Sequence, residues 1–156
     1  KNETNSLSYS IFIDASQLNG NGVNGLFVND SSLFLITSSF GGDKKQGHLY
    51  RVELDSDYQL NGNIMRVSDD VIGNGNLDGI IWHNGLIFIS DWESENSPAS
   101  IHVFDDELYQ LRYTISGNFK SPADIALDIN KNVIYIPEFT ENTVSELDIS
   151  TLKKVD

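Results

Sequence analysis

The chain has 156 residues, the size of one ordinary domain, and it contains no cysteine, which excludes a disulfide framework and a cysteine-ligated zinc site. Its 23 acidic and 10 basic residues give a formal net charge of −13, which repels nucleic-acid phosphates and anionic lipid. No apolar stretch approaches the roughly 20 residues that cross a bilayer, so we expect neither nucleic acid nor a membrane as a main partner.

The N-terminal part of the chain has a polar segment followed by a mostly apolar one. Residues 1–6 contain no apolar side chain, and we expect them to be disordered. Residues 7–18 contain a mostly apolar run over 9–13, which predicts an outer strand of a sheet. The chain opens at Lys1 and not at a methionine, which indicates either a removed leader or a piece of a longer chain. We expect an exported bacterial protein, periplasmic or extracellular, with a reducing cytoplasm as the alternative.

Three similar units follow, and we expect one blade over each of 20–70, 75–117 and 121–156. Each unit begins with a short strand, a tight polar turn and a second, strongly apolar strand. The first strands are expected over 24–28, 78–82 and 124–128, and the second over 33–37, 86–90 and 133–137. Near-continuous apolar runs like the second strands are typical of strands that are buried on both faces.

A third strand with alternating apolar and polar residues completes each pair. The third strands are expected over 47–54, 100–104 and 142–147, and a fourth over 64–67 and 108–114. In the last unit only a short tail stands where a fourth strand would be. The units start at Asn24, Asp78 and Asp124, which are 54 and 46 residues apart, close to the ~40–50 residues of a propeller blade. No stretch predicts a helix of useful length.

This repeat predicts an all-β fold, a β-propeller of about three four-stranded blades, which is half of a six-bladed ring. Three blades do not close a ring, and an open end exposes a blade face that would pack on a neighbour. We therefore expect either the remaining half of the propeller or a second copy as the partner. In such a homodimer, the N-terminal strand of one copy would complete the last blade of the other.

The start of each inner strand carries an oxygen-bearing side chain that faces the channel of a propeller. Asn24, Asp78 and Asp124 are therefore candidate ligands of Ca²⁺ or another divalent cation, since hard cations take six to eight oxygens. The acidic net charge favours the binding of cations. The alternative interpretation is that this charge only keeps the protein soluble. Asn24 and Asp78 each precede a glycine, which permits a tight backbone bend. The alternative for all three positions is that they satisfy backbone groups in turns.

The ends of the second strands carry the other candidate site residues. Ser38, Asp91 and Glu138 fall there, and Trp92 and Phe139 come directly after the last two. We expect Ser38, Trp92 and Phe139 to contact a small polar ligand, and Asp91 or Glu138 to act as a general base if the site is catalytic. Trp92 is either a stacking platform for the ligand or a packing residue between blades.

The three histidines do not have the spacing of metal ligands. His48 and His102 occupy the same position within their units, which favours a structural role over a catalytic one, and His83 lies in a turn. No motif for an organic cofactor is present, so a divalent cation is the one cofactor we expect.

Two segments resemble a known family of propellers. The residues of 75–80 and 86–92 are similar to the blade signature of gluconolactonase/regucalcin-like and NHL-repeat proteins. The residues of 121–126, 133–139 and 142–144 resemble the last blade of bacterial gluconolactonase-like proteins. The resemblance implies a six-bladed ring and a divalent cation at the channel mouth held by Glu, Asn and Asp side chains. Because 23–26 resembles the motif that supplies the Asn ligand, it implies this role for Asn24.

Two classes of function remain. The favoured one is a non-catalytic propeller of the gluconolactonase-like superfamily that binds a ligand or partner at its channel mouth. The alternative is a Ca²⁺-dependent lactone hydrolase, a metal-dependent enzyme in which metal-activated water attacks the ester carbonyl.

Overall fold

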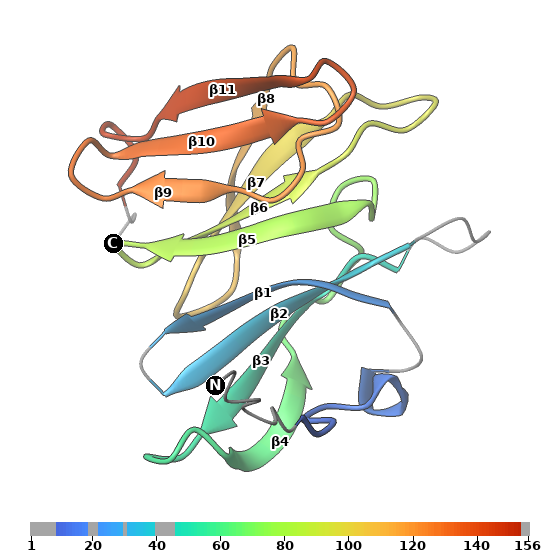
Figure 1. Cartoon of the computed structure of the whole chain (residues 1–156), viewed down its shortest axis with the longest axis vertical. Coiled ribbons are helices and arrows are strands. Elements are labelled where there is room, and N and C mark those ends of the chain that lie inside the picture. Colours follow the sequence, from blue (N-terminus) through green and yellow to red (C-terminus); the bar gives the residue numbers. More distant parts are fainter. Residues whose placement is uncertain (1–8, 19–21, 30, 40–45, 154–156) are drawn as a thin grey trace, which may run out of the picture.

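Antiparallel β-sheets make up nearly all of the regular secondary structure in the described residues. The structure is a computed structural model, and it describes residues 9–18, 22–29, 31–39 and 46–153. The disorder expected for residues 1–6 lies outside this described part. The described residues form two four-stranded sheets and one three-stranded sheet, and within each sheet the strands that are consecutive in sequence pair with each other (Figure 1). The all-β prediction is confirmed.

The strands follow the order of the repeat. The first sheet contains β1 (Gly22–Asn29), β2 (Ser32–Ser38), β3 (Leu49–Leu54) and β4 (Leu60–Arg66). The second contains β5 (Leu77–His83), β6 (Leu86–Asp91), β7 (Ser100–Asp105) and β8 (Leu111–Ser116). The third contains β9 (Ala126–Asp128), β10 (Val133–Glu138) and β11 (Thr143–Asp148). The described residues form three sheets but no closed ring, so a ring of six blades stays a prediction.

Burial follows the position of each sheet in the stack. Every residue of β2 and β6 is buried, as the apolar runs predict. Every residue of β7 is buried too, although its sequence predicts a half-buried strand. The second sheet lies between the other two and contributes to both large apolar clusters, so Phe104 packs on one side of β7 while Ile101 and Val103 pack on the other. A central sheet therefore has no solvent-facing side at β7.

β1 lies beside β5, and the residues just before β9, Asp124 and Ile125, approach β5 at Gly79 (Figure 1). Gly25 and Gly79 stand in bulges of β1 and β5 at these contacts. A β-carbon on Gly25 would lie 2.4 Å from the carbonyl oxygen of Asp78, and one on Gly79 would lie 2.6 Å from the amide nitrogen of Ile125. Neither glycine has a positive φ. The glycines are therefore needed for the close approach of one sheet to the next and not for a backbone bend.

The outer strand expected over 7–18 is wrong for the described residues 9–18. Residues 9–14 belong to no strand, and Ala15–Leu18 form one turn of 3₁₀ helix, η1. Asp14 causes this, because its carboxylate accepts hydrogen bonds from the amide and the hydroxyl of Ser16. Leu18 is then fully buried against the first sheet. No helix in the described part of the chain is long and apolar enough to cross a membrane.

Candidate functional site

A pocket of about 230 Å³ opens where the first strands of the first two sheets begin. It is lined by two carboxylates, two amides, two hydroxyls, an indole and a leucine: Asp78, Glu93, Asn24, Asn76, Ser38, Ser39, Trp92 and Leu77. We call it the mouth pocket. Four residues singled out from the sequence therefore meet here, namely Asn24, Ser38, Asp78 and Trp92.

Asp78 is the carboxylate at the centre of these contacts. The indole Nε1 of Trp92 donates a hydrogen bond to its Oδ2 at 3.0 Å. Burial raises the pKa of Asp78, and the negative charge of Asp124 raises it further, although the bond from Trp92 acts the other way. Asn24 lies alongside, with its side-chain nitrogen donating to the carbonyl of Leu77 at 2.9 Å. The pocket thus holds a carboxylate that is partly shielded from water.

Replacing Asp78 by Asn should stabilise the protein at neutral pH. The folded-state pKa of Asp78 is raised, so the ionised carboxylate costs stability above that pKa, and the cost disappears as the pH falls and both folded and unfolded states become protonated. Because Asp78 is only partly buried, the gain at pH 7 should stay below about 1 kcal/mol. Urea unfolding of both proteins at pH 7 and pH 3.5 checks this. A variant that is less stable at pH 7 would contradict the assignment.

Asp124, just before β9, and Phe139, just after β10, lie beside the pocket without lining it. Asp124 is exposed, and its Oδ1 accepts the amide of the next residue, Ile125, at 3.0 Å. Phe139 is 68 % exposed, and its ring centroid lies 5.5 Å from that of Trp92 with 32° between the planes. Trp92 therefore lines the pocket and also packs on an aromatic ring of the third unit, and its role as a stacking platform for a ligand stays a prediction.

The described residues do not form a complete cation site. Asn24, Asp78 and Asp124 offer three side chains, whereas Ca²⁺ takes six to eight oxygens. Among the described residues, no group of three or more His, Cys, Asp or Glu side chains is arranged to hold a metal ion. Calcium at this mouth would need further ligands.

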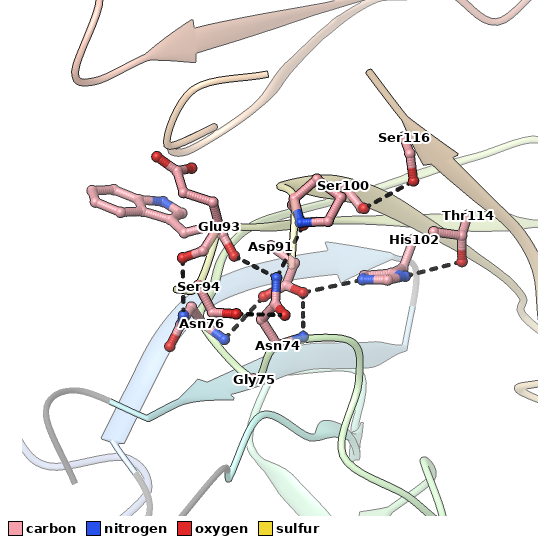
Figure 2. A network of polar contacts seen from close by, with 12 residues as sticks. Asn74, Gly75, Asn76, Asp91, Glu93, Ser94, Ser100, His102, Thr114 and Ser116 are labelled. Carbon is pink, nitrogen blue, oxygen red and sulfur yellow. Dashed lines mark hydrogen bonds and ion pairs between the residues drawn. The ribbon is translucent and has the colours of Figure 1, made fainter. Parts of the chain in front are cut away.

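Asp91 lies inside the second sheet and not in the mouth pocket. Its side chain is 1 % exposed. Its Oδ2 accepts the amide of Asn74 at 2.6 Å and contacts Nε2 of His102 at 3.2 Å, while its Oδ1 accepts the amide of Asn76 at 3.0 Å. Nδ1 of His102 lies 3.3 Å from the hydroxyl of Thr114 (Figure 2). This network fixes the loop that carries Asn76, so Asp91 positions the pocket from behind.

The strand register explains why Trp92 lines the mouth pocket and Asp91 does not. Asp91 pairs with Leu77, and its true counterpart in the first sheet is Thr37, which also pairs with the residue before the inner Asn or Asp. Ser38 therefore corresponds to Trp92 and not to Asp91. Since successive side chains of a strand point to opposite faces, this shift of one residue turns Asp91 inward and Trp92 toward the pocket.

Glu138 is also enclosed. It is buried at the end of β10, where its Oε2 accepts the amide of Lys120 at 2.9 Å and its Oε1 accepts the hydroxyl of Ser145. It pairs with Pro122 in an isolated bridge. These contacts tie the start of the third unit to β10 and leave Glu138 outside the mouth pocket.

The structure shows that His48 and His102 do not occupy the same position in their sheets, so the expected alignment of these two histidines is wrong. Ile89 pairs with His102, and its counterpart Leu35 pairs with Tyr50, so His102 corresponds to Tyr50 and not to His48. His48 and His102 are both buried, which agrees with the structural role expected for them.

Sequence reasoning missed Ser39, Asn76 and Glu93. Glu93 accepts the amide of Ser121 at 2.6 Å and its hydroxyl at 2.8 Å, and so links the pocket to the third unit. Burial alone would raise the pKa of Glu93, but its own backbone, Ser121 and the charge of Lys120 hold it below its ordinary value. Their position in the sequence could have indicated them, because all three residues stand in loops next to the ends of strands that line the pocket.

Comparisons with known proteins add little to this site. No family model matches the sequence, and the search of curated proteins finds no match. Among solved structures, the crystal structure of the computationally designed Ika4 protein is similar over 82 % of this chain and 91 % of that chain, with 9 % sequence identity and a TM-score of 0.45.

Proposed function

We propose that this chain is a propeller-type binding module that holds a small polar ligand in the mouth pocket without transforming it. The observation that carries the proposal is the convergence of Asp78, Glu93, Asn24 and Asn76 beside the indole of Trp92. Concave sites with a few convergent polar groups and an aromatic wall are the usual form of small-molecule sites. The resemblance to gluconolactonase-like and NHL-type blades supports the same type of module.

The pocket favours a neutral, hydroxyl-rich ligand such as a sugar or a sugar lactone. Carboxylates accept hydrogen bonds from ligand hydroxyls, and amide groups such as Asn76 can both donate and accept. An anionic ligand is disfavoured because Asp78 and Glu93 line the pocket and the chain carries a net charge of −13. The exposed part of Trp92 offers an apolar surface for the ring carbons of a sugar.

Binding without catalysis is supported by how the carboxylates are engaged. Asp78 accepts from Trp92, and Glu93 accepts from Ser121. Asp91 and Glu138, the carboxylates expected to act as a base, are enclosed in hydrogen bonds away from the pocket. The calcium-dependent lactone hydrolase stays the alternative, and its additional ligands would have to come from the rest of a ring or from a second copy.

Fluorescence of Trp92 tests the proposal directly. In the Trp82→Phe variant Trp92 is the one remaining indole, since the chain has two tryptophans. Titration with glucose and glucono-δ-lactone should change its emission, and calorimetry should show at least about tenfold weaker binding for Asn24→Ala and Asp78→Asn. Base uptake in a pH-stat, with millimolar calcium or with EDTA, measures lactone hydrolysis. Calcium-dependent release of acid would contradict the binding proposal and favour the lactone hydrolase. Unchanged emission of Trp92 with every ligand would contradict both proposed functions.

A further inference from the structure

A second cavity, of about 390 Å³, lies between the first two sheets on the side of their outer strands. The segment 67–73, which joins β4 to β5, forms one wall, and the hairpin between β7 and β8 forms the other. In Figure 1 this hairpin extends from the second sheet toward the first. The cavity shares no lining residue with the mouth pocket. We call it the side cavity.

One wall of the side cavity is apolar and partly open. It includes Phe104, Leu108, Tyr109 and Leu111. Leu108 is 65 % exposed and Leu111 is 52 % exposed, so these side chains still present apolar surface to solvent. Tyr109 has a left-handed backbone (φ 54) and is held in place by its packing on the ring of Phe34, at 6.4 Å between centroids. The wall is therefore anchored and does not close over the cavity.

The polar part of the lining is negatively charged. Asp69 and Asp70 lie on the opposite wall, both are exposed, and the lining contains no lysine or arginine. No ion pair of either carboxylate occurs in the part of the chain that the structure describes. His102 reaches the cavity, but both of its ring nitrogens already contact Asp91 and Thr114. The negative charge of the lining is thus that of the two aspartates, of which Asp70 also interacts electrostatically with His48.

We propose that the side cavity is a second small-molecule site, for an amphiphilic cation with an aromatic or short alkyl body and an ammonium head. Its volume lies within the range of about 300–1,000 Å³ of known ligand pockets. The body packs on Leu108, Tyr109 and Leu111, and the ammonium group faces Asp69 and Asp70. Tyr109 adds a ring face that attracts cations. The proposal is independent of the mouth pocket.

The test compares three ligands with the same body: phenethylammonium, 2-phenylethanol and 3-phenylpropionate. Methyl NMR spectra of Val67, Val71, Ile72 and Leu111 report where each one binds. Phenethylammonium should shift these methyl signals and bind about fivefold more tightly than the alcohol, and the carboxylate should bind least.

Matched charge variants complete the test. Asp69→Asn combined with Asp70→Asn should weaken phenethylammonium binding about fivefold and leave the alcohol unaffected. Asp57→Asn combined with Glu141→Gln removes the same charge from exposed positions outside the lining and should change neither. All four positions are exposed, and circular dichroism verifies that the variants fold. Equal affinity for cation and alcohol, or unmoved methyl signals at millimolar ligand, would overturn the proposal.

Discussion

Replacing Asp91 by Ala should lower the free energy of unfolding by about 3–5 kcal/mol, because it leaves buried donors without an acceptor. The amides of Asn74 and Asn76 and the ring of His102 all converge on this carboxylate, whose side chain is 1 % exposed. Asp91→Asn should cost less, about 2–3 kcal/mol, since one oxygen remains while the new amide faces a backbone N–H.

Asp55 provides the matched control for Asp91. Its carboxylate also accepts two backbone amides, those of Asp57 and Gln59, but it does so in an exposed turn. Asp55→Ala should therefore cost no more than about 1 kcal/mol, because water takes over as the partner. Urea unfolding followed by circular dichroism measures all variants. A loss for Asp91→Ala no larger than that of Asp55→Ala would show that the network in Figure 2 contributes little.

The strands could be predicted from the sequence because their signals are local. Apolar runs with polar turns placed β2, β6 and β10 within one residue of their observed ends. The prediction of the outer strand β8 was less accurate, because the strand begins at Leu111 and not at residue 108. Asp105 causes this shift, since its carboxylate accepts the amides of Glu107, Leu108 and Gln110 and so extends the turn. Hydrogen bonds of this kind, from backbone amides to one side chain, are specific to a single turn and leave no periodic pattern in the sequence.

The candidate site was predictable only where it follows the repeat. Asn24 and Asp78 stand at the start of successive inner strands, and the structure brings both into the mouth pocket. Asp91 and Trp92 differ by one residue, and the sequence does not fix which of them faces the pocket. β6 pairs with β7 without a bulge, so the alternation along β6 places Asp91 on the same face as Ile89 and turns the next residue, Trp92, the other way. Which face of β6 turns toward which neighbouring sheet depends on contacts between sheets, which no local pattern records.

The inner glycines are the clearest case of a residue chosen by a contact between sheets. A β-carbon on Gly79 would lie 2.6 Å from the nitrogen of Ile125 and 2.9 Å from the α-carbon of Asp124, both backbone atoms that cannot turn aside. Gly79→Ala should therefore force the third sheet away from the second and cost about 2–3 kcal/mol. Gly25→Ala should cost a similar amount at the other interface, where Asp78 is the neighbour.

Gly22 separates this effect from the general consequences of replacing glycine. A β-carbon there would meet its nearest atom, the carbonyl oxygen of Ser38, at an ordinary 3.7 Å. Gly22→Ala should be neutral or stabilise by up to about 1 kcal/mol, because alanine restricts the unfolded chain. Hydrogen exchange then locates the damage: Gly79→Ala should speed exchange in β10 and leave β2 protected, since only the interface with the third sheet is strained. Equal exchange in β10 of the two variants would show that the sheets can shift at no cost, and the glycines would then need another explanation.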